Sequence, residues 1–206
     1  MIRVLLADDQ AMIRSALAAL LSLEADLEVV GEAGTSAEAV DQAARTHPDV
    51  ILLDVQMPAG GAATGDGIDA LPLLTRAAPD ARVIVVTTFG RPGYLRRALE
   101  AGAVGFMVKD APADRLIEGV RRAASGLRVV DPELAAASLS MGPSPLTEKE
   151  TEVLAAASGG ATTAEIARAV FLSEGTVRNY LSSAIGKLGA RNRAEALRTA
   201  TESGWI

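Results

Sequence analysis

Along the first 125 residues, short apolar runs alternate with stretches in which apolar residues recur every three or four positions. The runs predict β-strands and the stretches predict amphipathic α-helices, because side chains alternate across a strand and return to one helix face about every 3.6 residues. Strands are predicted at about 2–7, 29–33, 50–53, 82–87 and 104–108, and helices at about 10–23, 36–46, 68–78, 91–101 and 112–125. Two of the runs, 50–53 and 83–86, are apolar throughout, as in parallel strands covered on both faces. The pattern predicts an α/β domain of five strand–helix repeats.

The pattern ends between residues 131 and 145, where Gly142-Pro143-Ser144-Pro145 can continue neither a helix nor a central strand. We therefore predict one domain over residues 1–125, a linker over 126–145 and a second domain over 146–206.

The second domain is predicted to be small and all-helical. Thr147 with Glu150, and Thr162 with Glu165, have the spacing of capping boxes that open helices, and Ser173 is expected to cap a third helix. Helices are predicted at about 147–157, 163–170, 173–188 and 193–203.

Composition narrows the class of protein. The 206 residues, 49% of them hydrophobic, suffice for two cores. The absence of cysteine excludes disulfides and thiolate metal sites, and the single histidine, His47, excludes a paired-histidine site. No apolar run approaches membrane-spanning length, and Asp8-Asp9 ends the first run too early for a signal peptide. We expect a cytoplasmic protein with no membrane partner.

The net charge of −6 argues against broad nucleic-acid binding, but the charge is unevenly distributed. Residues 1–130 carry a net −4, residues 131–145 carry −2, and residues 146–206 are neutral. The C-terminal part is the least acidic.

Polar residues stand at the ends of four predicted strands: Asp8-Asp9, Asp54, Thr87 and Lys109. Ligands collect beyond the carboxyl ends of parallel strands, so we expect these groups to converge. Three crowded carboxylates repel one another unless a cation lies among them, and Mg²⁺ prefers oxygen ligands. With the ion bound, one carboxylate can act as a nucleophile toward a phosphoryl group.

Each of these residues also has an ordinary explanation. Asp8 or Asp9 could cap a helix, Asp54 could be a turn residue, Thr87 a strand residue and Lys109 a solvated charge. The joint placement of complementary groups at four strand ends favours a functional site.

Residues 1–125 resemble the receiver domain of bacterial two-component response regulators, which has a flavodoxin-like (βα)5 fold. The resemblance rests on the motifs Asp8-Asp9, Asp54-Val55-Gln56-Met57-Pro58, Thr87-Thr88, Ala101-Gly102-Ala103 and Phe106-Met107-Val108-Lys109. It implies that Asp54 accepts a phosphoryl group. It also implies that Asp8, Asp9, Asp54 and the main-chain carbonyl of Gln56 hold Mg²⁺.

The resemblance implies further roles around the acceptor. Thr87 would hydrogen bond to the aspartyl phosphate, Lys109 would pair with it, and Phe106 would change rotamer together with Thr87. A phosphate adds nearly two negative charges, enough to pull Thr87 inward and bias a two-state surface. The phosphate would also hydrolyse slowly, with Gln56 and Phe89 beside the incoming water; apart from this, no enzyme activity is expected.

One segment departs from the family pattern. Residues 59–65 form a Gly/Ala-rich insertion ahead of Asp66-Gly67, which family members usually reach sooner after Met57-Pro58. A tolerated surface insertion and an altered kinase access or phosphate lifetime are both open.

The C-terminal helices have the order that a helix-turn-helix needs: a capped helix, a short turn and a second capped helix with a polar face. Over 173–188, Val177, Leu181, Ala184 and Leu188 repeat at one-face spacing and leave polar residues outside. Taken alone, these residues leave a solvated helical bundle open as the alternative.

Nearly all of residues 146–206 resemble a LuxR-type helix-turn-helix. The matching segments are Leu146-Thr147, Glu150, Val153-Leu154, Glu165-Ile166-Ala167, Leu172-Ser173, Thr176-Val177-Arg178, Lys187-Leu188-Gly189, Arg193-Ala194-Glu195-Ala196 and Gly204-Trp205. The resemblance makes 173–188 the recognition helix, with DNA contacts from Ser173, Thr176, Arg178, Asn179, Ser182 and Lys187. Few cations imply modest affinity per monomer, so dimerisation is expected. Leu197, Ala200 and Trp205 could supply a dimer contact, or could be ordinary core.

The whole chain resembles a NarL/FixJ-type response regulator. We expect a sensor histidine kinase to phosphorylate Asp54, after which a homodimer binds promoter DNA. One alternative is a regulator of the same architecture that works without phosphorylation. Another is a metal-dependent phosphatase with Asp54 as nucleophile, although such enzymes of the haloacid dehalogenase type carry an acid where this chain has Gln56.

Overall fold

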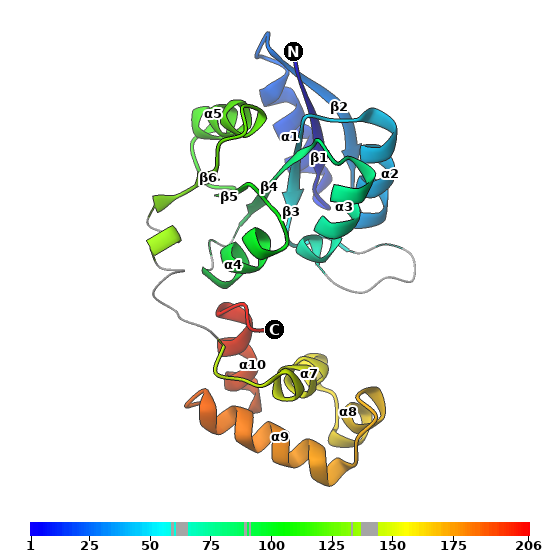
Figure 1. Cartoon of the computed structure of the whole chain (residues 1–206), viewed down its shortest axis with the longest axis vertical. Helices are drawn as coiled ribbons and strands as arrows, with labels where there is room; N and C mark the ends of the chain where they lie inside the picture. The colour runs from blue at the N-terminus through cyan, green and yellow to red at the C-terminus, as the bar shows by residue number, and fades with distance from the viewer. Residues whose placement is uncertain (59, 61–65, 89, 91, 133, 137–143) are drawn as a thin grey trace. The chain divides into compact units, whose positions relative to one another are not determined.

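Figure 1 shows the computed structural model of the chain, which describes residues 1–58, 60, 66–88, 90, 92–132, 134–136 and 144–206. The chain divides into two compact units. The first contains Met1–Gly90 and Leu95–Ala135, and the second contains the four C-terminal helices. Each unit has a hydrophobic core of its own.

The first unit is built on a parallel sheet of six described strands in the order β2-β1-β3-β4-β5-β6 (Figure 1). The strands are β1 (Ile2–Ala7), β2 (Leu27–Ala33), β3 (Val50–Asp54), β4 (Arg82–Thr87), β5 (Gly105–Val108) and β6 (Val129–Val130). The predicted flavodoxin-like fold is confirmed, because β1 to β5 have the 2-1-3-4-5 order of that fold. The sequence pattern did not predict β6, since its two valines, which pair with Gly105 and Phe106, are too few to form a recognisable run.

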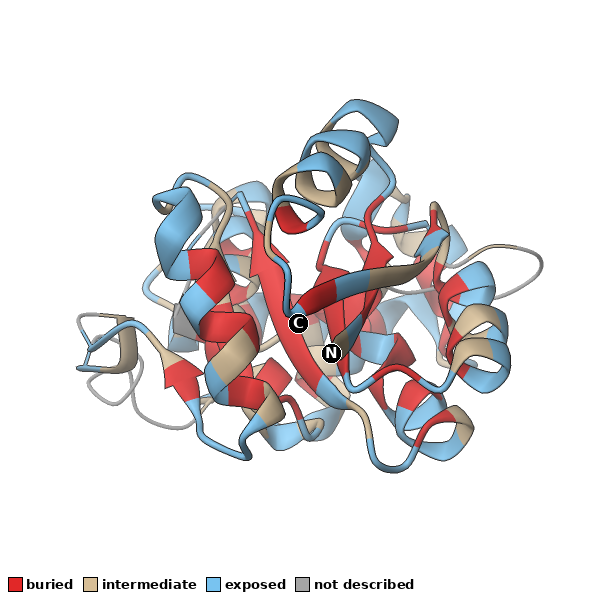
Figure 2. Cartoon of the chain, turned by 90° about the horizontal axis from the view of Figure 1, so that it is seen from above, coloured by how far each residue is buried: buried red, intermediate tan, exposed pale blue. Residues whose placement is uncertain are grey.

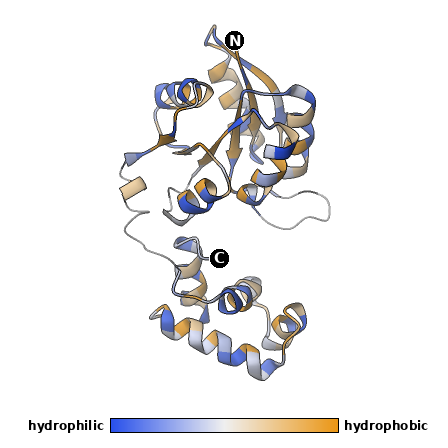
Figure 3. Ribbon diagram, in the orientation of Figure 1, coloured by the Kyte–Doolittle hydropathy of each residue, from blue (hydrophilic) through white to orange (hydrophobic). Residues whose placement is uncertain are grey.

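Helices cover the sheet. They are α1 (Ala11–Leu21), α2 (Ser36–Thr46), the 3-10 helix η1 (Gly67–Ala70), α3 (Leu71–Ala77), α4 (Pro92–Glu100) and α5 (Ala113–Ala124). One apolar cluster joins Leu21 of α1 and Val120 of α5 to the strand residues Leu6, Leu52 and Ile84. Strand residues are largely buried and the outer faces of the helices are exposed (Figure 2), and the strands are the most hydrophobic part of the unit (Figure 3).

One local prediction needs correction. The helix predicted over 68–78 is divided into η1 and α3, with a proline in the first turn of α3. Thr35 and Glu38, at the start of α2, also have the spacing of a capping box, but only half of the box is formed. Thr35 Oγ1 accepts from the Glu38 N–H, whereas the Glu38 carboxylate accepts from the N–H of Gly34, the residue before Thr35, at 2.8 Å.

The second unit contains α7 (Glu148–Ala156), α8 (Thr163–Ala169), α9 (Glu174–Lys187) and α10 (Arg193–Glu202), and a short turn η2 (Ser158–Gly160) that the sequence did not predict. The four predicted helices are confirmed, and both predicted capping boxes, at Thr147 and Thr162, are formed. The core contains Val153, Ile166 and Val177. Within the described part of the chain, every helix is too short or too polar to cross a bilayer.

Candidate functional site: an acidic cluster and a helix-turn-helix

The carboxyl ends of β1, β3, β4 and β5 bring the predicted acid-site residues together. Asp54 is the last residue of β3 and Thr87 the last of β4, while Asp8 and Lys109 directly follow β1 and β5. Register places Asp54 beside Val86, and Thr87 beside Val108. The Lys109 N–H donates to the Thr87 carbonyl at 2.7 Å, which fixes the start of the loop after β5.

A single ammonium group joins two buried carboxylates. Lys109 Nζ lies 2.9 Å from Asp54 Oδ2 and 2.6 Å from Asp8 Oδ2. Asp8 and Asp54 are 3% and 2% exposed, and Thr87 is fully buried. Asp9 is exposed, yet carboxylate oxygens of Asp8, Asp9 and Asp54 lie within 4.8 Å of one another.

Burial and charge pull the protonation of this cluster in opposite directions. Burial raises the pKa of Asp54 above its ordinary value, and the hydrogen bond from Lys109 only partly offsets this. Burial acts to lower the pKa of Lys109, but hydrogen bonds to Asp8 and Asp54 outweigh it and the pKa is raised. Lys109 therefore stays cationic beside the two acids.

The donor set fits a hard cation. Asp54 Oδ1 is buried and has no hydrogen-bond partner among the described residues, so one acceptor oxygen of the cluster is left for a ligand. Three converging carboxylates are the oxygen ligands that Mg²⁺ prefers. Receiver domains bind Mg²⁺ at an acidic pocket of this kind.

The other predicted receiver residues differ in burial. Phe106 of β5 is fully buried, and its ring is among the largest buried side chains. Gln56 is exposed, two residues after Asp54. Phe89 and the insertion at 59–65, apart from Gly60, lie outside the described residues.

Sequence reasoning missed Arg14, which anchors the loop that carries the acids. Arg14 Nη1 donates to the main-chain carbonyl of Asp8 at 2.5 Å, and Nε lies 3.2 Å from Glu32 Oε2. The Asp8 carboxylate also accepts from the Gln10 N–H at 2.9 Å, but Gln10 is itself the N-cap residue of α1 and no side chain caps that helix, so the capping interpretation of Asp8 is wrong. An arginine on a helix face has no sequence signal that separates such a contact from solvation.

In the second unit, α9 presents a polar face. Arg178, Asn179 and Ser182 are exposed, whereas Val177 and Leu181 are buried. Ser173 and Thr176 are engaged in the cap of α9, because Ser173 Oγ accepts from the Thr176 N–H at 3.1 Å and lies 2.8 Å from its hydroxyl.

Lys187 forms an ion pair with Glu150. Lys187 Nζ lies 2.7 Å from Glu150 Oε2, Ser183 Oγ donates to Oε1 at 2.6 Å, and the Thr147 N–H also donates to Oε2 at 2.7 Å. The Lys187 hydrogen bond, followed by that of Ser183, lowers the pKa of Glu150 to about 2. Glu150 thus joins the start of α7 to the end of α9.

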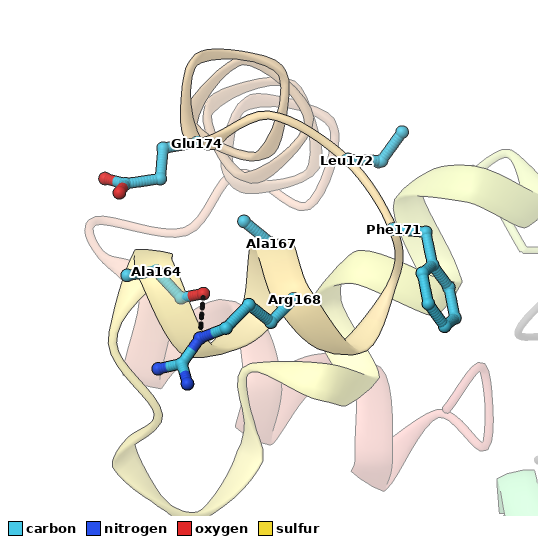
Figure 4. Close-up of a pocket in the computed structure, with 6 residues that line it drawn as sticks. All are labelled: Ala164, Ala167, Arg168, Phe171, Leu172 and Glu174. Atoms are coloured by element: carbon cyan, nitrogen blue, oxygen red, sulfur yellow. Dashed lines mark hydrogen bonds between the residues drawn. The ribbon is translucent and has the colours of Figure 1, made fainter.

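The turn between α8 and α9 exposes an aromatic side chain. Phe171 is 93% exposed and has φ of 54°, in the left-handed region. Figure 4 shows it beside a shallow hollow with Ala164, Ala167, Arg168, Leu172 and Glu174. By contrast, the apolar residues considered for a dimer contact pack in the core: Ala200 is fully buried, and Leu197 and Trp205 lie against the same cluster.

The first unit is a flavodoxin-like sheet with acids, a threonine and a lysine at its carboxyl edge, and the second unit is a helix-turn-helix. Together these two units define a class of regulator that joins a receiver to a DNA-binding domain. Two family models agree with this class. The model of the response regulator receiver domain matches residues 4–121, and that of bacterial regulatory proteins of the luxR family matches residues 144–200.

Relatives match over the full chain. The chain is 42% identical to an uncharacterized transcriptional regulatory protein, YvfU, and 40% identical to the transcriptional regulatory protein DesR, both of Bacillus subtilis, over 100% of this chain and of each relative. Among solved structures, the response regulator RcsB in complex with DNA is 26% identical with a TM-score of 0.67, over 98% of each chain. The chain therefore belongs to the NarL/LuxR family of two-component response regulators, which are transcriptional regulators rather than enzymes.

Proposed function

We propose that a sensor histidine kinase activates this regulator by phosphorylating Asp54, and that the activated chain dimerises and binds promoter DNA. The observation that carries the proposal is the state of Asp54: it is buried, Lys109 holds one carboxylate oxygen, and the other has no described partner. This arrangement leaves Oδ1 available to attack phosphorus. We assign the roles to a receiver domain at 1–125, a linker at 126–145 and a DNA-binding domain at 146–206.

The proposed transfer breaks a phosphorus–nitrogen bond and forms a phosphorus–oxygen bond. An Asp54 oxygen attacks the phosphohistidine of the kinase, and the leaving histidine nitrogen takes up a proton. Asp8, Asp9, Asp54 and the Gln56 carbonyl would hold Mg²⁺, which when bound neutralises charge on the transferring phosphoryl oxygens.

After transfer, the residues of this chain bind the new phosphate. Lys109 now bridges Asp8 and Asp54, and it would pair with a phosphoryl oxygen that replaces the Asp54 carboxylate charge. The Thr87 hydroxyl would hydrogen bond to a second oxygen. Movement of Thr87 opens space beside the buried ring of Phe106, which then changes rotamer. Slow hydrolysis, with Gln56 and Phe89 beside the water, would reset the site.

The proposed DNA interface is the exposed face of α9. Arg178, Asn179 and Ser182 are assigned to base or backbone contacts because their side chains are exposed. Ser173 and Thr176, at the start of the helix, are assigned to phosphates, which set register. Lys187 is assigned to a phosphate as well, although it would have to leave Glu150 to make that contact. The RcsB–DNA complex among the similar structures supports the interface.

The decisive experiment compares wild type with Asp54→Asn, and uses Asp41→Asn, at an exposed position of α2, as a matched control. Each protein is incubated with Mg²⁺ and phosphoramidate. Intact mass, light scattering and affinity for a DNA fragment selected from a random pool are then measured. We expect wild type and Asp41→Asn to gain one phosphoryl group, dimerise and bind DNA more tightly, and Asp54→Asn to do none of these. Equal DNA binding with and without the donor would favour a phosphorylation-independent regulator.

A further inference from the structure

Arg97 in α4 forms an ion cluster to which the phosphoryl chemistry assigns no role. Its Nη1 donates to Asp66 Oδ2 at 2.9 Å, and its Nη2 donates to Asp69 Oδ1 at 3.0 Å and to Asp66 Oδ1 at 3.3 Å. The side chains of Arg97 and Asp66 are only 24% and 27% exposed. Asp69 is 53% exposed, but the two charge-assisted hydrogen bonds from Arg97 to the less exposed Asp66 contribute more than an isolated surface ion pair.

The two carboxylates that Arg97 binds also build the start of η1. Asp66 Oδ1 accepts from the N–H groups of Ile68 and Asp69, and Asp69 Oδ2 accepts from the Asp66 N–H at 3.0 Å. This capping box brings two negative charges together. Arg97 compensates both, so the geometry of residues 66–70 depends on a side chain of α4.

Gly67 joins this segment to the phosphoacceptor. Its N–H donates to the Val55 carbonyl at 2.8 Å. A Cβ on Gly67 would lie 1.9 Å from the main-chain oxygen of Asp54, so the segment packs directly on the Asp54 backbone with no room for a side chain. A shift of Gly67 must therefore move, or expose, the backbone that carries the acceptor.

These contacts form a continuous path from α4 through Asp66 and Gly67 to Asp54. We propose that Arg97 is a positioning residue that couples α4 to the main chain of Asp54. The inference rests on the proposed function, since it concerns the site where Asp54 takes the phosphoryl group. Coupling free energies are reciprocal, so phosphorylation of Asp54 alters α4 through Arg97, and a change in α4 alters the packing of residues 66–70 on the Asp54 main chain.

Replacing Arg97 with glutamine tests the coupling. Arg97→Gln keeps a polar side chain but leaves Asp66 and Asp69 uncompensated, and their repulsion loosens residues 66–70. We expect the Gly67 amide, followed by NMR, to exchange with solvent about threefold faster or more. We expect a similar rise in the hydrolysis rate of phosphorylated Asp54, because looser packing of residues 66–70 on the Asp54 main chain admits water.

Two further variants separate positioning from general stability. Arg121→Gln is the matched control, because Arg121 in α5 likewise binds two carboxylates, Asp26 at 2.6 and 2.8 Å and Glu24 at 2.7 Å. It is expected to leave Gly67 exchange and the phosphate lifetime unchanged. Arg97→Lys keeps the compensating charge and is expected to restore most of both.

The two measurements also separate this inference from the proposed function. Amide exchange needs no phosphoryl donor, so it decides the coupling even if wild type takes no phosphoryl group, a result that would overturn the proposed function alone. Unchanged Gly67 exchange in Arg97→Gln, or an equal acceleration in Arg121→Gln, overturns the coupling. Faster exchange with an unchanged phosphate lifetime overturns the positioning role.

Discussion

Gly67 occupies a position where only hydrogen fits, since any Cβ would overlap the Asp54 carbonyl. We expect Gly67→Ala to cost more than about 2 kcal/mol of unfolding free energy, because backbone on both sides must move. Phosphorylation of Asp54 should slow as well. Chemical denaturation and intact mass measure the two effects.

Gly186→Ala is the matched control for this substitution. Gly186 lies inside α9, and, apart from the adjoining backbone of that helix, a Cβ there meets no described atom within 4 Å. The same change should therefore stabilise the second unit by about 0.5–1 kcal/mol. A neutral Gly67→Ala would contradict the close packing behind Asp54.

At the scale of single residues, the sequence predicted those, such as Asp54 and Lys109, that have a reactive or charged side chain and also stand at the end of a strand. It did not predict Arg14 or Arg97. Their carboxylate partners are 18 and about 30 residues away on other elements, and an arginine on an amphipathic helix is ordinarily solvated. Only the folded chain distinguishes these side chains from their neighbours.

Between elements, Glu150 ties α7 to α9 through Lys187 and Ser183. The pKa of Glu150 falls from 4.5 to about 2 in the folded chain. The contribution of the Glu150 carboxylate to the free energy of unfolding is therefore complete above about pH 4.5, and it is lost as the pH falls toward 2. We expect Glu150→Gln to melt earlier at neutral pH and to lose less stability on acidification over this range.

Trp205 reports this effect, because it is the only tryptophan of the chain and packs against the core of the second unit. Its fluorescence can follow thermal unfolding at each pH. Glu152→Gln is the control, since Glu152 pairs with Lys149 at the surface, where both side chains are nearly half exposed. Equal losses in the two variants would contradict a special role for Glu150.

Periodicity and capping predicted the long elements well because each has its own local signal. The capping boxes at Thr147 and Thr162 are formed as predicted. The misses are short: β6 has two residues, and η1 separates from α3 within one apolar stretch. Such pieces depend on neighbours in space, which a local pattern does not contain.

For the whole molecule, charge pairing limits how strongly DNA binding depends on salt. Lys187 Nζ lies 2.7 Å from the buried carboxylate of Glu150, whereas Arg178 forms a longer ion pair, 3.5 Å from the exposed Glu174. We expect Arg178→Gln to reduce the slope of log affinity against log salt by about 0.9 per monomer. Lys187→Gln should reduce that slope by less, because Lys187 must leave Glu150 to reach a phosphate, and it should also destabilise the second unit. Fluorescence anisotropy over a salt series measures both slopes, and a larger effect of Lys187→Gln than of Arg178→Gln would contradict this order.

The sixth strand has a consequence for where the receiver domain can be cut. Because Val129 and Val130 pair with Gly105 and Phe106, and the first unit extends to Ala135, residues 126–135 lie in the first unit. A receiver that ended at residue 125 would leave β5 as an open sheet edge with unpaired main-chain groups. Such a fragment should associate edge to edge, whereas a fragment that ends after residue 135 keeps the edge covered.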